Sequence, residues 1–386
     1  MPEPLVPISR GRARVAIGGA APLKIFFLIH DDYAAGGLQR STIAARDCLA
    51  EAGHDVAIYC IKTLEGGFAD SHPDVHALGR NRRWKPIFWA DFLQALRREI
   101  ATGRPDLCIG MGLSTSILLV LATLGMRRPR LFGSERAYPP ATPAPAHWRM
   151  LRRFAFRRLD KVICQTAQTA DWFETAMGLN RRRLAIIPNV VDAPSSDPAA
   201  APPELAPFSG QPLIACIGRL EPQKGFDMAL PIFAGTAEQR PDARFLIVGE
   251  GPLEARLKTQ ASHLGLEDIL LFLPRLPGLG GLWPRVSIFL LTSRFEGIPN
   301  VLAEAMAHGV ASVAFDCPTG PSELIRDGEN GFIVPLGDVD AAIRRCVELL
   351  EDAELGMRIG GQAEAVATRY SRAVICMLWN ELVEAR

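Results

Sequence analysis

The chain of 386 residues is 48% hydrophobic and 22% charged. This is the composition of a globular protein with a sizeable core, and the length predicts two domains. The formal net charge is +1, but residues 1–200 contain 27 Lys and Arg against 18 Asp and Glu, whereas residues 201–386 contain 16 against 24. This asymmetry indicates two domains that face different partners.

The eight cysteines form no C-x-x-C pair, and most lie in apolar runs. This pattern argues against a disulfide framework or zinc site and predicts reduced, buried thiols in a cytoplasmic protein. Residues 1–22 lack a long apolar run, so we expect a flexible leader and not a signal peptide. Residues 109–126 carry no charge over 18 positions, near the length of a membrane span. Their three glycines and several hydroxyls instead favour a strand end, a loop and a buried helix.

Short apolar runs without alternation recur along the chain, each followed by a loop and often by a helix-like segment. They lie at 24–30, 55–60, 106–112, 161–166, 184–189, 212–218, 244–249, 269–273, 286–292, 311–316 and 331–335. Such runs are typical of strands buried on both faces of a parallel sheet.

A stretch rich in Pro, Ala and Ser interrupts this pattern and predicts a linker at residues 192–211. The sequence therefore predicts two doubly wound α/β domains, residues 23–191 and 212–370, that face a central cleft. We expect residues 371–386 to form a C-terminal helix that crosses back to the first domain.

In such sheets, ligands bind beyond the carboxyl ends of the strands. After the first strand, Gly36 and Gly37 allow close backbone approach, and the following helix offers free amides to an anion. An ordinary Gly-containing turn is the alternative. No G-x-G-x-x-G motif follows this strand, which argues against a nicotinamide dinucleotide site.

The loop after 212–218 reads "GRLEPQKGFD". Arg219 and Lys224 are two cations beside flexible backbone at Gly218, which suits a diphosphate. The next strand ends at Gly249 and Gly251, which leave room for a ligand. A solvated charged turn is the alternative for the two cations.

The stretch "SRFEGIPNVLAEAMAHGV", residues 293–310, holds two carboxylates. Glu296 lies on a loop, Pro299 suits the first position of a helix, and Glu304 lies further along that helix. Carboxylates accept hydrogen bonds from hydroxyl pairs such as those of sugars, and a helix N-terminus complements phosphate. The alternative is a Glu that only favours the helix dipole and a second Glu in solvent.

These stretches, together with "GGLQRS", "VGEGP" and "FDCPTGPSELIRDGENGFIVPLGDVDAA", resemble the family 4 glycosyltransferases. The resemblance spans most of the chain and is more specific in the second half. It implies a GT-B fold, in which two Rossmann-like domains face a cleft. The run "FDCPTGP…NGFIVP" is similar to a branch that builds bacterial surface polysaccharides and lipid-linked oligosaccharides.

By this resemblance, Arg219 and Lys224 hold the diphosphate of a nucleotide sugar and Glu304 holds the ribose hydroxyls. The family retains anomeric configuration and needs no bound metal or other cofactor. That property fits two cations that stabilise the leaving diphosphate.

The resemblance also assigns the donor sugar to Glu296 and to the loop at Gly297, Ile298 and Pro299. Gly36 and Gly37 are expected to contact the phosphates from the other domain.

Base recognition is expected near Arg275 and Leu276. Many members carry a His in a loop of the first domain, where this chain reads "FGSERAYPP". Glu135 and Arg136 are therefore candidate donor or acceptor contacts in its place.

Two segments of the basic half, residues 79–100 and 147–159, mix Arg with Trp and Phe. They predict peripheral contact with an anionic membrane, with solvated basic helices as the alternative. No nucleic-acid recognition motif accompanies the charge. The D-x-D pattern at 338–340 is interpreted as a helix N-cap at Asp338 and not as a metal site.

We therefore expect a retaining glycosyltransferase. It would move a hexose or N-acetylhexosamine from a UDP sugar to a glycan or polyprenyl-diphosphate-linked acceptor in surface polysaccharide biosynthesis. A nucleotide-sugar epimerase and a non-catalytic nucleotide-sugar-binding protein are the alternatives. The expected location is the cytoplasm or the inner face of the cytoplasmic membrane.

Overall fold

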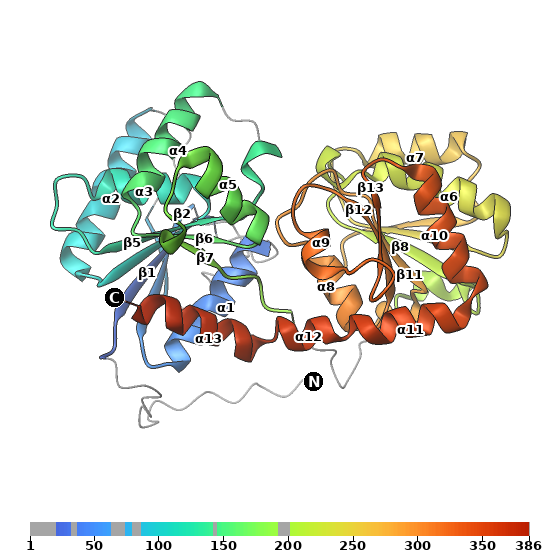
Figure 1. Ribbon diagram of the computed structural model, residues 1–386. Helices are drawn as coiled ribbons and strands as arrows, with labels where there is room; N and C mark the ends of the chain where they lie inside the picture. The colour runs from blue at the N-terminus through green and yellow to red at the C-terminus, as the bar shows by residue number, and fades with distance from the viewer. Residues whose placement is uncertain are drawn as a thin grey trace, which may run out of the picture. The chain divides into compact units, whose positions relative to one another are not determined.

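The computed structural model describes residues 21–31, 37–62, 74–78, 86–141, 145–191 and 201–385 (Figure 1). The chain divides into two compact units. One consists of Met1–Phe132 with Leu378–Arg386, and the other of Gly133–Met377. The domain boundaries drawn from the sequence stay a prediction.

The first sheet has seven strands in the order β3-β2-β1-β4-β5-β6-β7. Its strands are β1 (Lys24–Asp31), β2 (Asp55–Lys62), β3 (Val75–Ala77), β4 (Leu107–Met111), β5 (Arg130–Glu135), β6 (Lys161–Cys164) and β7 (Leu184–Ile186). Its helices are α1 (Gly37–Glu51), α2 (Pro86–Gly103), α3 (Leu113–Ala122), α4 (Ala146–Arg158) and α5 (Ala167–Met177). The five apolar runs of the first half all form strands, whereas β3 and β5 were not predicted.

The uncharged stretch at residues 109–126 contains the end of β4 and all of α3, as the sequence predicts. Helix α3 has 10 residues, and most of them are buried. Among the described residues, no helix has the length and apolar character needed to span a membrane.

The second sheet has six parallel strands in the order β10-β9-β8-β11-β12-β13. These are β8 (Leu213–Ile217), β9 (Arg244–Val248), β10 (Leu270–Leu273), β11 (Ile288–Leu291), β12 (Ala311–Asp316) and β13 (Phe332–Pro335). All six were predicted. Their side chains pack against those of the covering helices. For example, the ring of Phe245 on β9 stacks on the ring of Phe233 on a helix, with centroids 4.6 Å apart.

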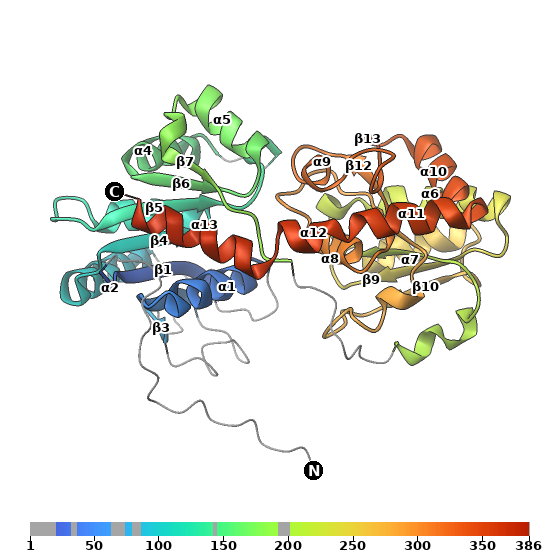
Figure 2. The ribbon, with the colours of Figure 1, turned by 60° about the horizontal axis from the view of Figure 1, so that its bottom comes forward.

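Helices lie on both faces of this sheet (Figure 1 and Figure 2). They are α6 (Phe226–Gln239), α7 (Glu254–His263), α8 (Asn300–Ala307), α9 (Pro321–Leu324), α10 (Val339–Glu351), α11 (Ala353–Ala363) and α12 (Ala365–Arg369). Helix α10 begins as predicted, because the Asp338 carboxylate accepts a hydrogen bond from the Ala341 amide at 2.9 Å. The order in which strands are added to the sheet reverses between β8 and β11, so the sheet has a topological switch point there.

The last helix, α13 (Arg372–Glu384), contributes its final residues to the first unit. There Trp379 packs edge-on against Phe27 of β1 with ring centroids 6.0 Å apart. Arg130 of β5 donates to the carbonyls of Val383 and Ala385. These contacts anchor the chain end to the strands of that unit.

The cysteines are mostly as predicted. Six are buried and form no disulfide: Cys60, Cys108, Cys164, Cys216, Cys317 and Cys346. Cys48 and Cys376 are disulfide-bonded, so the prediction of eight reduced thiols is wrong for these two.

Helix α11 supplies a matched pair of glycines that tests how it packs. A Cβ at Gly360 would lie 2.0 Å from the Gly309 carbonyl oxygen, whereas a Cβ at Gly361 meets nothing within 4 Å. We expect Gly361→Ala to raise the free energy of unfolding by about 0.5–1 kcal/mol through helix propensity. Gly360→Ala should lower it by about 1–3 kcal/mol through overpacking. Urea denaturation of both variants checks this, and shifts of equal sign would contradict the packing.

Candidate functional site

Four loops meet at the carboxyl edge of the second sheet, where the strand order reverses. They follow β8, β9, β11 and β12. At this edge the backbone of the β8 loop crosses that of the β9 loop. A Cβ at Gly249 would lie 1.8 Å from the Gly218 oxygen, and one at Gly251 would lie 2.5 Å from the Leu220 oxygen. These glycines therefore make room for neighbouring backbone, and their contact with a ligand stays a prediction.

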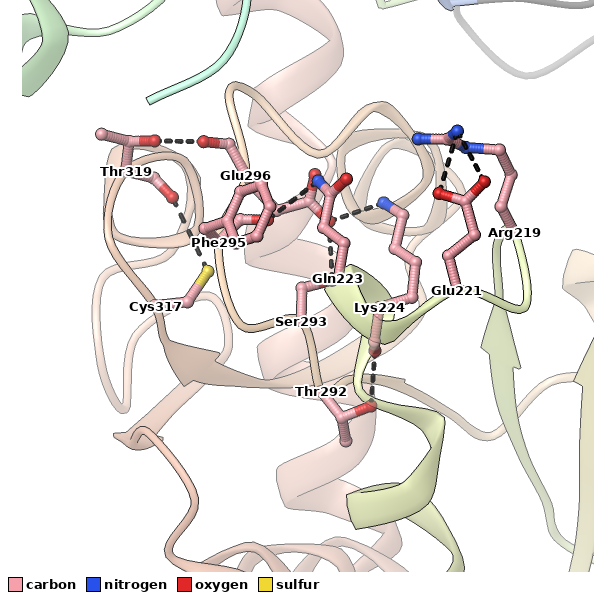
Figure 3. A network of polar contacts seen from close by, with 10 residues as sticks. All are labelled: Arg219, Glu221, Gln223, Lys224, Thr292, Ser293, Phe295, Glu296, Cys317 and Thr319. Carbon is pink, nitrogen blue, oxygen red and sulfur yellow. Dashed lines mark hydrogen bonds and ion pairs between the residues drawn. The ribbon is translucent and has the colours of Figure 1, made fainter. Parts of the chain in front are cut away.

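An ion pair occupies the centre of this edge. Lys224 Nζ lies 2.6 Å from Glu296 Oε1, and Ser293 Oγ donates to the same oxygen at 2.6 Å (Figure 3). The Lys224 side chain is 16% exposed and that of Glu296 is 7% exposed. Removal of one partner would leave the other charge uncompensated in a mostly dry environment, which is strongly unfavourable.

Backbone contacts fix the two loops that carry this pair. Lys224 ends the short helix η5 (Pro222–Lys224), and its carbonyl accepts a hydrogen bond from Thr292 Oγ1 at 3.1 Å. Gln223 Nε2 donates to the Phe295 carbonyl at 3.0 Å. These two hydrogen bonds hold the β8 and β11 loops together.

A second ion pair, not predicted from the sequence, anchors the loop that follows β11. Arg294 contacts Asp227 at the start of α6 through two hydrogen bonds of 2.9 and 2.6 Å. The hydrogen bonds from Arg294 lower the pKa of Asp227. Sequence spacing gives no signal for this pair, because 67 residues separate its members.

Arg219 lies apart from this cluster. Its guanidinium is 3.0 Å from the Glu221 carboxylate, and its side chain is 66% exposed (Figure 3). The structure therefore brings together Lys224 and Glu296, while Arg219 is held at the surface by a neighbour on its own loop. A diphosphate contact by Arg219 stays a prediction.

Glu304 is half-buried on α8 and has a partner that the sequence did not reveal. Trp283, at the start of the short helix η6 (Trp283–Arg285), donates its indole N–H to Glu304 Oε1 at 3.1 Å. Trp283 is 1% exposed, so this donor is fixed. The solvent-exposed alternative for Glu304 is wrong. The prediction for Pro299 is wrong by one residue, because α8 begins at Asn300.

The remaining predicted residues are more scattered. Arg275 is exposed and Leu276 half-buried in the loop that follows β10. Gly37 is the first residue of α1 in the first unit, and Gly36 lies outside the described residues. Ile298 is 7% exposed and packs inward.

Glu135 and Arg136 lie at the end of β5, in the second unit. A Cβ at Gly297 would lie 2.4 Å from the Arg136 carbonyl oxygen, so the backbone of Arg136 touches the loop of Glu296. Arg136 Nη1 also donates to Asn189 Oδ1 at 2.9 Å, and Asn189 Nδ2 donates to Asn300 Oδ1 at 2.7 Å. Asn189 was not predicted, since a single Asn after a strand carries no distinctive pattern.

The Glu135 side chain is almost fully enclosed. It is 7% exposed, Oε1 accepts from the Arg136 amide at 3.2 Å, and Oε2 has no hydrogen-bond partner among the described residues. Burial raises the pKa of Glu135 to about 7, although the charge of Arg152 and two backbone amides oppose the shift. A carboxyl group that changes protonation near neutral pH is suited to proton transfer.

Comparison with known proteins decides the family. Residues 35–193 match the model described as Glycosyltransferase Family 4, and residues 199–366 match that described as Glycosyl transferases group 1. The chain belongs to the family 4 glycosyltransferases.

The relatives of this glycosyltransferase differ in length. An exopolysaccharide phosphotransferase of Streptomyces coelicolor is 31% identical over 306 residues, 78% of this chain. The chain spans only 31% of that relative's own length. An N-acetylgalactosaminyltransferase of Campylobacter jejuni is 24% identical over 376 residues, 94% of this chain and 98% of its own. Its full name describes transfer to a glycan on undecaprenyl diphosphate.

Solved structures agree on the fold. The HepE protein of Anabaena, crystallised with UDP and glucose, superimposes with a TM-score of 0.78 at 20% identity. The match covers 94% of this chain and all of that one. The glycosyltransferase therefore has the GT-B fold with two Rossmann-like sheets, as the sequence predicts.

The buried Glu135 predicts a pH dependence of stability. Between about pH 4.5 and pH 7, the folded protein keeps a proton that the unfolded chain has lost. The contribution of Glu135 to the free energy of unfolding therefore falls as pH rises through this window, by about 3 kcal/mol in all. Glu135→Gln should gain stability relative to wild type as pH rises from 5 to 7.5.

Urea denaturation at a series of pH values measures this difference. Glu267→Gln, at an exposed position, is the control and should show a constant offset from wild type. A Glu135→Gln offset that does not change with pH would contradict the assignment.

Proposed function

We propose that this glycosyltransferase moves a hexose or N-acetylhexosamine from a UDP sugar to a glycan acceptor, with retention of anomeric configuration. The observation that carries the proposal is the contact between Lys224 and Glu296. Their 2.6 Å separation supports it, because a cation suited to phosphate lies beside a carboxylate suited to sugar hydroxyls. A nucleotide sugar presents this combination where its sugar is joined to its diphosphate.

Each member of the pair retains capacity for a substrate. Lys224 has three N–H donors, of which one is directed at Glu296. The described hydrogen bonds to the Glu296 carboxylate all reach Oε1, so Oε2 is available to a sugar hydroxyl. Lys224 would stabilise the charge that develops on the departing diphosphate, while Glu296 orients the sugar ring.

Glu304 suits the ribose in the same way. Trp283 occupies Oε1 and fixes the carboxylate plane, which leaves Oε2 to accept from a hydroxyl. With Arg219 as a second cation, the site needs no metal to neutralise the diphosphate. The use of UDP is supported by the fold relative crystallised with UDP and glucose, and Arg275 and Leu276 are the proposed neighbours of the base.

For the acceptor, we propose a glycan carried on a polyprenyl diphosphate during bacterial surface polysaccharide synthesis. The Campylobacter relative, whose name includes undecaprenol, supports this choice. Glu135 is the proposed acceptor-side group, because its protonation changes near neutral pH and the adjoining backbone touches Gly297. An epimerase would need no acceptor, so conversion of the donor alone would indicate that alternative.

We also propose that α4 contacts the inner face of an anionic membrane. The helix contains no acidic residue, and Arg149, Arg153 and Arg157 are exposed on it. Between them, Met150 is 73% exposed and Phe154 is 40% exposed. Arg with interspersed apolar side chains suits the headgroup region of such a membrane. The other predicted segment, residues 79–100, lies partly outside the described residues.

A binding measurement tests the donor site. UDP at 100 times its dissociation constant should raise the stability of the wild type by about 2.7 kcal/mol, whereas NAD should produce no shift. Trp283→Phe removes one hydrogen bond to a charged group, so UDP affinity measured by calorimetry should fall roughly 10- to 100-fold. Glu304→Gln should weaken binding similarly, and Glu267→Gln should not.

A thermal shift with NAD alone, or unchanged UDP affinity in Glu304→Gln, would sink the donor assignment. Product anomers resolved by NMR, in the presence of EDTA, then report on retention and metal independence.

Flotation with liposomes that contain anionic lipid tests α4. Arg153→Gln with Arg157→Gln should reduce the bound fraction several-fold at low salt, since each cation near the surface contributes about 1 kcal/mol. Arg344→Gln with Arg358→Gln removes the same charge from exposed positions elsewhere and should not change binding. Equal losses in both double variants would show that only net charge matters.

A further inference from the structure

The turn that follows β12 holds the backbone of Glu296 on both sides. The Glu296 amide donates to the Pro318 carbonyl at 3.4 Å, and Thr319 Oγ1 donates to the Glu296 carbonyl (Figure 3). A Cβ at Gly320 would lie 2.2 Å from the Gly297 carbonyl oxygen. The turn and the Glu296 loop are therefore in direct contact along several residues.

Thr319 adopts an unusual backbone conformation. Its φ is 63°, in the left-handed region that β-branched residues rarely adopt. Its side chain is fully buried, and its own carbonyl accepts from Cys317 Sγ at 3.8 Å. Glycine or asparagine would adopt this backbone conformation with less strain. Strain of this kind persists where the surrounding structure enforces it, most often at functional sites.

This backbone conformation sets the direction of the Thr319 hydroxyl. It reaches the carbonyl of the residue whose carboxylate meets Lys224 and Ser293. Without that hydroxyl, the buried carbonyl of Glu296 would lose the side-chain donor that the structure gives it. The carboxylate could then turn away from Lys224, because the Glu296 carbonyl would no longer be bound to the turn that follows β12.

We propose that Thr319 is a positioning residue, whose hydroxyl holds Glu296 in contact with Lys224 for transfer of the sugar. The proposal rests on the proposed function for its catalytic consequence but not for the contact itself. Thr319 touches no reacting group and acts only through Glu296.

The first test needs no turnover. A double-mutant cycle of Lys224→Met and Glu296→Gln measures, by urea denaturation, the coupling energy between the two side chains. We expect this coupling to fall by more than half in a Thr319→Val background and to be retained in Thr319→Ser. Coupling that is unchanged in Thr319→Val would overturn the proposal.

Thr319→Gly is the second variant without a hydroxyl, and it relieves the left-handed backbone. It should therefore fold even where Thr319→Val does not, and it should lose the coupling equally. Retention of the coupling in Thr319→Gly would also overturn the proposal.

The second test separates positioning from general loosening. In Thr319→Val and Thr319→Gly, kcat with a UDP sugar should fall at least 10-fold, while UDP affinity stays within 2-fold of wild type. Thr319→Ser should restore kcat. Equal losses of kcat and UDP affinity, or no rescue by serine, would show a merely structural role. An inactive wild type that keeps the coupling pattern would instead count against the proposed function alone.

Discussion

The buried ion pair of Lys224 and Glu296 is the constraint on which the site depends. Two opposite charges can remain in a mostly dry environment only if each has close partners. That requirement explains why four loops converge here, with Ser293, Thr292 and the turn after β12 all directed at the pair or its backbone. The glycines at the strand ends serve the same purpose, since they let the loops approach one another.

Much of the second sheet follows from the sequence, because strands buried on both faces are uninterrupted apolar runs between turns. The same logic fails for β3, which has only three residues. It also fails for β5, where Arg130, Gly133 and Ser134 interrupt the apolar pattern. The predicted helix N-cap at Asp338 was confirmed, because this role depends only on the residues that follow Asp338.

The site residues likewise divide into those with a local sequence signal and those without one. Glu296, Glu304 and Lys224 were visible because they stand in recognisable sequence motifs. Trp283, Asp227 and Asn189 were not, since each acts across a long sequence separation on a group that it never neighbours in the chain. Glu135 was noticed only as a departure from a family pattern. Its raised pKa arises from burial, a property of the folded chain that residue identity does not encode.

The six buried thiols have a practical consequence. Three lie in the first sheet, at Cys60, Cys108 and Cys164, and three lie in or beside the second, at Cys216, Cys317 and Cys346. Burial raises the pKa of Cys346 to about 12 and that of Cys216 well above its ordinary value, so these thiols are inert while enclosed. Alkylation can reach them only when the surrounding structure opens. Each sheet therefore contains its own native reporters of opening, and alkylation of these cysteines can reveal whether the two sheets unfold together or in succession.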